Sequence, residues 1–403
     1  MCFANAPVPG AVTLSPAAFR SSPRGHVSPT PSPRRSDRAS DPVALRSAAE
    51  GEQGTPRRVV RHQRLLALGL IALVAAAVVL LVVIATGGPG SRRHGTARTA
   101  PGQSASGTRS TGAKPVPSSF AVGLHVLHLL DTSRTITLPN GTSEPRPLLT
   151  YVRYPALGAP DRTDLLNAPQ AREDGPFPLV VFGHGFAVTP AFYARMLQSW
   201  ARAGYVVAAP VFPLENTDAP GGPDESDLTN QPADMSFVIS RILAAGSSGS
   251  GPLAGLVDST HIAVAGQSDG GDTALAVAYD PSYRDPRVSA AVILSGAEIP
   301  GIGGFAFSAG SPPLLATQGT ADTVNPPSAT SAFFDAASRP KYLLRLLGAE
   351  HLPPYSAQQP QLGIVEGVTI AFFDGYLKHR AGALQRLVSL GSAPGKASLR
   401  AEP

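Results

Sequence analysis

Residues 266–270 read Gly-Gln-Ser-Asp-Gly and contain the chemically most specific pattern in this chain. A Gly-x-Ser-x-Gly pentapeptide between a strand and a helix places its serine on a sharp turn with the hydroxyl exposed. The apolar stretch 261–265 predicts the strand, and the Ala-rich stretch 271–279 predicts the helix. Both glycines must stay small because a strained turn leaves no room for a Cβ atom beside it. We therefore predict that Ser268 is a nucleophile.

A serine hydroxyl is a weak nucleophile at neutral pH, so it needs an imidazole to accept its proton and a carboxylate to orient that imidazole. Asp322 and His351 each follow a predicted strand, at 314–317 and at 342–347 respectively. The carboxyl ends of strands in an open α/β sheet meet in one crevice. We expect both side chains to reach Ser268 there, as acid and base. The alternatives are an ordinary turn aspartate and a surface histidine.

The chemistry also needs backbone N–H donors for the developing oxyanion. Residues 182–186 (Phe-Gly-His-Gly-Phe) follow a long buried strand, and their glycines allow the main chain to approach closely. We assign the two donors to the amides of Phe186 and Asp269, the second of which also begins a helix and gains from its dipole. His184 is expected to pack beneath the site, because no second ligand is spaced for a metal. No metal and no cofactor is predicted.

Strands and helices alternate along residues 119–388, which we predict to be the catalytic domain. The predicted strands lie at 120–130, 148–154, 177–182, 205–209, 261–265, 288–294, 314–317 and 342–347. The predicted helices lie at 190–202, 231–245, 271–279, 326–337 and 364–378. Such alternation is typical of an α/β fold with a mainly parallel sheet and helices on both faces. The connection at 295–313 is too short to build a large helical lid.

Charge is divided unevenly along the chain. Residues 1–118 carry 15 Lys and Arg against 4 Asp and Glu, whereas residues 119–403 carry 18 against 24. Because nucleic-acid binding needs a basic face on the folded module, no nucleic-acid partner is predicted. Cys2 is the only cysteine, which excludes an intramolecular disulfide and a cysteine-ligated structural metal site.

The segments outside the predicted catalytic domain differ in composition. Residues 1–64 are rich in Ser, Pro and Arg and predict a disordered basic tail. Residues 65–86 carry no charge, are long enough to span a bilayer and follow four arginines, which predicts a signal anchor with a cytoplasmic N-terminus. A cleaved signal peptide and a buried core helix are the alternatives. Residues 87–118 predict a flexible linker, and residues 389–403 a disordered tail.

The acidic residues between 215 and 227 could suggest a calcium-binding site, but they lack the alternating ligand spacing of a calcium loop. We expect their carboxylates to form a solvated rim. These residues are Glu215, Asp218, Asp224, Glu225 and Asp227.

Residues 120–378 resemble serine esterases of the α/β-hydrolase fold, in particular the group that contains platelet-activating-factor acetylhydrolases, dienelactone-hydrolase-like proteins and cutinase-like polyester hydrolases. The resemblance is carried by residues 146–155, 184–186, 232–238, 266–271, 319–322 and 348–351. It implies that Ser268, Asp322 and His351 are nucleophile, acid and base. It also implies oxyanion donors at Phe186 and Asp269.

Three positions depart from the patterns of that group. Gln267 stands where many members have histidine, and we expect its side chain to point off the turn. A serine nucleophile argues against dienelactone hydrolase activity proper, which uses cysteine. Trp200, the only tryptophan, is far along the chain from Ser268, so the aromatic clamp of polyester hydrolases is not evident.

These features predict a membrane-anchored, extracytoplasmic serine hydrolase that cleaves a small-molecule or cell-envelope carboxylic ester through an acyl-enzyme. Two alternatives remain at this stage. The same residues would also suit an acyltransferase that uses a cell-envelope alcohol as acceptor. A non-catalytic envelope-binding module is the other alternative.

Overall fold

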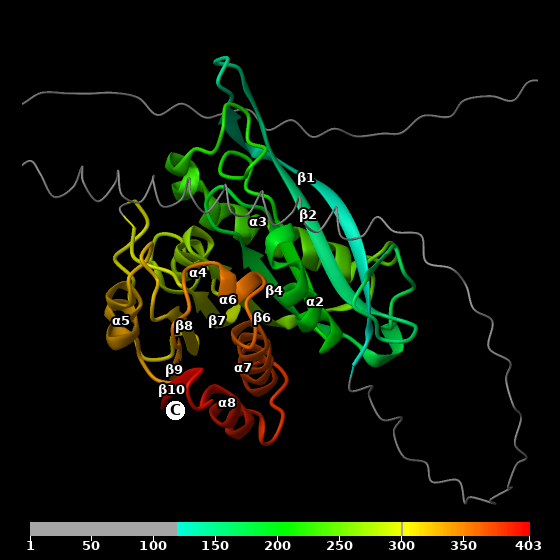
Figure 1. The fold of residues 1–403 in the computed structure, drawn as a ribbon. Coiled ribbons are helices and arrows are strands. Elements are labelled where there is room, and N and C mark those ends of the chain that lie inside the picture. The colour runs from blue at the N-terminus through cyan, green and yellow to red at the C-terminus, as the bar shows by residue number, and fades with distance from the viewer. Residues whose placement is uncertain (1–118, 300) are drawn as a thin grey trace, which may run out of the picture. The chain divides into compact units, whose positions relative to one another are not determined.

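The structure, a computed structural model, describes residues 119–299 and 301–403 (Figure 1). Within them, ten strands form one sheet in the order β10-β9-β8-β7-β6-β4-β5-β2-β1-β3. The strands are β1 (Ala121–Thr137), β2 (Ser143–Ala156), β3 (Asp164–Leu166), β4 (Phe177–Gly183), β5 (Val206–Pro210), β6 (Val257–Gln267), β7 (Val288–Leu294), β8 (Leu314–Gly319), β9 (Lys341–Leu346) and β10 (Ala397–Glu402). The α-helices are α2 (Ala194–Arg202), α3 (Gln231–Ser247), α4 (Asp269–Tyr279), α5 (Pro327–Ala336), α6 (Pro353–Ser356), α7 (Gln361–Tyr376) and α8 (Ala383–Gly391). Short 3-10 helices are η1 (Arg172–Asp174), η2 (Pro190–Tyr193) and η3 (Glu225–Asn230).

The sheet is parallel in its middle, antiparallel pairs flank this part, and the short edge strand β3 pairs in parallel with β1. Strands β5, β4, β6, β7, β8 and β9 pair in parallel, and β1, β2 and β10 join them through antiparallel pairs. Consecutive parallel strands require crossover connections, and helices supply them except between β7 and β8, where the described residues 295–299 and 301–313 form none. The prediction of an α/β fold with a mainly parallel sheet is therefore confirmed, and each predicted strand has a counterpart among the observed ones.

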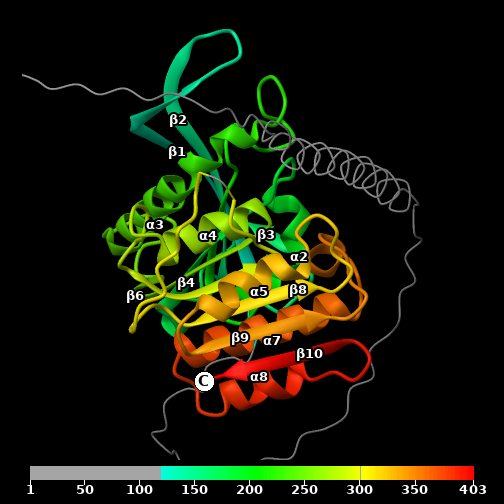
Figure 2. The same ribbon diagram turned by 90° about the vertical axis from the view of Figure 1, so that its left-hand side faces the viewer.

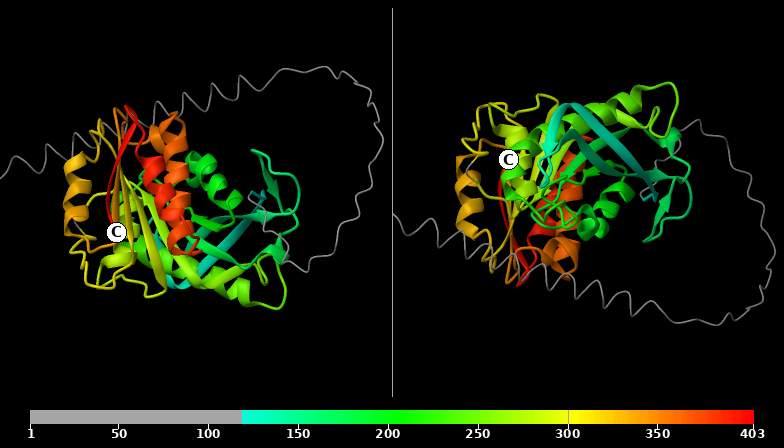
Figure 3. Two further views of the ribbon diagram at one scale, coloured as in Figure 1. Left: turned by 90° about the horizontal axis from the view of Figure 1, so that it is seen from below. Right: turned by 90° about the horizontal axis from the view of Figure 1, so that it is seen from above.

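Helices cover both faces of the sheet (Figure 3). On one face α3, α4 and α5 contribute Met235, Leu275 and Phe334 to a buried apolar cluster with the strands. On the other face α2, α7 and α8 bury Trp200, Phe372 and Leu387 in a second cluster. Because β4 and the second half of β6 are covered on both faces, β4 and residues 262–266 of β6 are continuously apolar and buried.

The prediction of a disordered tail at residues 389–403 is wrong, and the catalytic domain extends beyond its predicted end at residue 388. The end of α8 and the whole of β10 occupy this segment, and β10 pairs with β9 (Figure 2). Without β10, the backbone groups of β9 would form an open edge, and pairing satisfies them. Composition alone does not reveal such a long-range pairing.

The membrane prediction falls outside the described part of the chain, as do the predicted segments 1–64, 65–86 and 87–118. In residues 119–299 and 301–403, none of the helices has both the length and the apolar character that crossing a bilayer requires.

The acidic loop after β5 is not uniformly solvated, which corrects the expectation of a rim. Asp218 and Asp224 are exposed, but Glu215 and Asp227 are buried. Asp227 accepts two hydrogen bonds from Arg146, at 2.9 and 2.6 Å. A buried carboxylate requires such pairing, and the arginine comes from β2, far away in the sequence.

Candidate active site

Ser268 lies on the turn between β6 and α4, where the sequence predicts it. Its φ of 55° belongs to the left-handed region that non-glycine residues rarely adopt. A Cβ atom on Gly266 would fall on the carbonyl of Gly270, and one on Gly270 would fall on the carbonyl of Gly183. The close packing of these backbones holds the strained serine in place. The sharp strand-to-helix turn that the pentapeptide predicts, called the elbow below, is therefore present.

The three polar side chains singled out in the sequence lie in one hydrogen-bonded row. Ser268 Oγ is 2.8 Å from His351 Nε2, and His351 Nδ1 is 2.8 Å from Asp322 Oδ2. The carboxylate can only accept, so Nδ1 carries the proton and Nε2 is left to accept from the serine hydroxyl. All three residues are buried, with 3 to 5% of their surface exposed. The arrangement can move a proton from the serine to the imidazole.

Asp322 is surrounded by donors. The amides of Val324 and Asn325 donate to its Oδ1 at 3.0 and 2.9 Å. Gln318 Nε2 donates to its Oδ2 at 3.1 Å, beside His351. These contacts satisfy both oxygens of the Asp322 side chain and fix its position beside the imidazole.

The loops that carry Asp322 and His351 are fastened to each other. The amide of Ala321 donates to the carbonyl of Ala349 at 2.9 Å. Gly319 permits this approach, because a Cβ atom there would collide with the carbonyl of Ala349. Main-chain contacts between the two loops therefore position Asp322 and His351 at the carboxyl ends of β8 and β9.

The loop after β4 approaches the elbow from the other side. Among the described residues the amide of Phe186 has no hydrogen-bond acceptor. The next residue, Ala187, has a φ of 56° and donates its amide to the carbonyl of Glu215 at 2.9 Å. Asp269 begins α4 directly after Ser268. The two amides predicted as oxyanion donors thus belong to segments that flank the serine.

His184 is buried under this loop and is held as a neutral imidazole. The amide of Phe212 donates to its Nε2 at 2.9 Å, so Nδ1 carries the proton and donates to the carbonyl of Gly185 at 2.8 Å. Burial lowers the pKa of His184 to about 4. Its partners are backbone groups of two loops, which matches the expectation that it packs beneath the site.

Gln267 and Tyr193 are two site residues whose contacts sequence reasoning missed. The Gln267 side chain does not point away: its Nε2 lies 3.2 Å from His351 Nε2 and donates to the His351 carbonyl at 3.2 Å. Tyr193 donates its hydroxyl to Gln267 Oε1 at 2.6 Å and accepts from the amide of Gly185 at 3.3 Å. The pair links His351 to the loop after β4. The position before the nucleophile was the available signal for Gln267, whereas nothing local indicated Tyr193.

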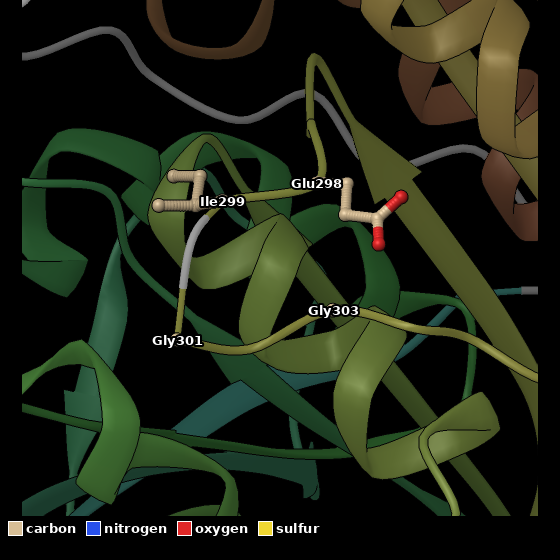
Figure 4. Close-up of a pocket in the computed structure, with 4 residues that line it drawn as sticks. All are labelled: Glu298, Ile299, Gly301 and Gly303. Atoms are coloured by element: carbon tan, nitrogen blue, oxygen red, sulfur yellow. The ribbon is translucent and has the colours of Figure 1, made fainter. Parts of the chain in front are cut away.

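A pocket elsewhere does not offer comparable chemistry. Glu298, Ile299, Gly301 and Gly303, in the connection between β7 and β8, line a space of about 450 Å³ (Figure 4). The only carboxylate among these four accepts from the amide of Gly304 at 2.6 Å and so stabilises its own loop. Within residues 119–299 and 301–403, no group of three or more His, Cys, Asp or Glu side chains is arranged to hold a metal ion.

Comparison with known proteins bears on the class of this site. The family model described as Chlorophyllase matches residues 152–314, which include the oxyanion loop and Ser268 but end before Asp322 and His351. The sequence has no significant match among curated proteins. Among solved structures, a ferulic acid esterase from Streptomyces cinnamoneus is similar at 23% sequence identity and a TM-score of 0.48. That similarity covers 65% of this chain and 91% of the other.

Proposed function

We propose that this protein is a serine esterase of the α/β-hydrolase fold, a carboxylic ester hydrolase whose catalytic triad is Ser268, His351 and Asp322; the family match over residues 152–314 supports this class. The observation that carries the proposal is the pair of 2.8 Å contacts that joins the serine to the imidazole and the imidazole to the carboxylate. Geometry of this kind identifies a triad better than sequence position does.

In the proposed reaction, Ser268 Oγ attacks the ester carbonyl while its proton passes to His351 Nε2. The amides of Phe186 and Asp269 hold the oxyanion of the tetrahedral intermediate. As that intermediate collapses, the leaving alcohol takes the proton from Nε2 and an acyl-enzyme remains. Water then attacks the acyl group and gives a proton to His351 Nε2. As the second intermediate collapses, Nε2 returns that proton to Ser268 Oγ and the acid is released, and Asp322 stabilises the imidazolium in both halves.

The test is removal of the nucleophile. Ser268→Ala should abolish hydrolysis of a para-nitrophenyl ester and labelling by a fluorophosphonate, because both need the same hydroxyl. Ser282→Ala is a matched control, since Ser282 is exposed and donates only its backbone amide, to Asp280. Peptide mass spectrometry should place the phosphonate on Ser268 in the wild type. Full hydrolysis by Ser268→Ala would refute the proposal.

We also propose that residues 65–86 anchor the enzyme in the membrane with the catalytic domain on the extracytoplasmic side. The support is the uncharged run of 22 residues and the arginines before it. The full chain with an N-terminal tag should stay in the membrane fraction after alkaline carbonate extraction and keep its tag. Replacing Leu73 and Val78 by arginine should release it. Loss of the tag from the wild-type chain would instead indicate a cleaved signal peptide.

A further inference from the structure

Glu215 is a buried carboxyl that touches both segments proposed to hold the oxyanion. It lies in the loop after β5, with none of its surface exposed. Its carbonyl accepts from the amide of Ala187, the residue after Phe186, at 2.9 Å. Its carboxyl lies beside that of Asp269, the residue after Ser268, and the two groups interact. One residue therefore joins the loop after β4 to the first residue of α4.

The hydrogen bond between the Ala187 amide and the Glu215 carbonyl is made at a residue with a strained backbone. Ala187 has a positive φ, a strained conformation that a residue with a Cβ atom keeps only where its surroundings fix it. The hydrogen bond to the Glu215 carbonyl is such a fixing contact. The same hydrogen bond fixes the peptide plane between Phe186 and Ala187, which adjoins the plane that carries the Phe186 amide.

The side-chain contact fixes the protonation of Glu215. Burial raises the pKa of the Glu215 carboxyl well above its usual value, and the adjacent Asp269 carboxylate raises it further. Asp227 acts in the same direction, although it is paired with Arg146. Opposing them, Gln231 donates its Nε2 to Glu215 Oε2, and its own Oε1 accepts from Thr273 at 2.8 Å. Two facing carboxyls cannot both ionise cheaply, so Glu215 keeps a proton and donates it to Asp269.

We propose that Glu215 is a positioning residue for the oxyanion hole, holding the Phe186 amide through its own carbonyl and the Asp269 amide through its carboxyl O–H. The proposal rests on the function proposed above. Glu215 itself touches no reacting atom. Its contribution is to keep two amides aimed at one point, which matters because a misdirected donor loses most of its stabilisation of the transition state.

Replacement of the carboxyl tests this role. Glu215→Met keeps the length of the side chain but has no donor, and we expect its kcat to fall by about 100-fold, comparable to the loss of one oxyanion donor. The KM for a para-nitrophenyl ester should change little, because the hole binds the transition state more than the substrate. Glu215→Gln keeps a neutral N–H donor for Asp269 and an acceptor for Gln231, so its kcat should stay close to that of the wild type.

A transition-state analogue separates positioning from a merely structural role. A trifluoromethyl ketone adds to Ser268 and places an oxyanion in the hole, so Glu215→Met should weaken its inhibition by the same factor as it lowers kcat/KM. Asp218→Asn in the same loop is the matched control, because Asp218 is exposed. If Glu215→Met does not fold, Glu215→Asp replaces it, since shortening by one methylene withdraws the hydroxyl from Asp269.

The inference is overturned if Glu215→Gln is as impaired as Glu215→Met, or if kcat falls without any loss of affinity for the ketone. An unchanged kcat in a folded Glu215→Met or Glu215→Asp variant would overturn it as well. Fluorophosphonate labelling distinguishes these results from failure of the proposed function. Slow labelling of Ser268 in Glu215→Met leaves the triad intact, whereas hydrolysis by Ser268→Ala refutes the triad itself.

Discussion

Buried titratable groups lie on both sides of Ser268, but their surroundings differ. On one side hydrogen-bond donors surround a carboxylate, and on the other side a carboxyl faces a second carboxyl. On the side of the base, Asp322 accepts from two backbone amides, Gln318 and His351. On the oxyanion side, Glu215 faces a second carboxyl, and burial raises its pKa well above the usual value. His184 on that side is buried and neutral. Burial is therefore common to the two sides, and what differs between them is the number of hydrogen-bond donors that face each carboxyl.

The same chemical change on the two sides should have opposite results, and this is the largest effect we expect. Asp322→Asn removes a charge that the proposed imidazolium needs and presents an N–H group to His351 Nδ1, which disfavours the active tautomer. We predict a loss of about 10³- to 10⁴-fold in kcat/KM. Glu215→Gln, also an acid-to-amide change, should lose less than about threefold, since it replaces a neutral acid. Steady-state kinetics measure kcat/KM of both variants, and circular dichroism confirms that both are folded. Equal losses of kcat/KM would contradict the expected difference between the two sides.

Acidification should destabilise the oxyanion side through His184. Its pKa is lowered from 6.5 to about 4, so the unfolded chain binds the proton more readily than the folded protein in this interval. Stability contributed by the neutral imidazole is present above pH 6.5 and is lost as pH falls towards 4, by about 3 kcal/mol in all. Urea unfolding at several pH values measures this loss. His184→Gln retains an acceptor for the Phe212 amide and should show a shallower slope over this interval, whereas an unchanged slope would assign the pH dependence to other groups.

Gln267 and Tyr193 connect the two sides of Ser268, and the energetic coupling between these two side chains can be measured from kcat in single and double mutants. Gln267→Leu removes the donor to the His351 carbonyl and leaves the Tyr193 hydroxyl without its acceptor. We expect about a tenfold loss of kcat, equivalent to about 1.4 kcal/mol. Tyr193→Phe should have a smaller effect alone and add little to Gln267→Leu, because the two side chains act through one hydrogen bond. Strictly additive losses in the double mutant would show that the side chains act independently.

The smallest effect concerns stability at higher pH. Because the folded protein binds a proton at Glu215 more tightly than the unfolded chain, the stability this group contributes is present below the usual glutamate pKa of 4.5 and is lost as pH rises through the folded value. Glu215→Gln has no such titration. The Tm difference between Glu215→Gln and the wild type should therefore move in favour of the variant as pH rises. A constant difference would mean that Glu215 is charged in the folded protein.

Most of the sheet and the row of three polar side chains could be anticipated from the sequence. Val288–Leu294 and Leu314–Gly319 are short apolar runs that predict buried strands, and Asp322 follows one of them. Strand β10 could not be anticipated, since its pairing partner is β9, far away in the chain. The contact of Gln267 with His351 was missed for the same reason. The expectation that Glu215 is solvated was wrong, because loop composition does not report which carboxyls the fold buries.

The sequence by itself determined the elbow, the chain order of Ser268, Asp322 and His351, and the alternation of strands and helices, because local sterics and periodicity are properties of near neighbours. Only the tertiary structure decided which groups lose water and which donors face them. Glu215 meets Asp269 and His184 meets the Phe212 amide through chain segments that no local pattern brings together. Desolvation and hydrogen bonding act over a few ångströms in space, whatever the separation along the chain.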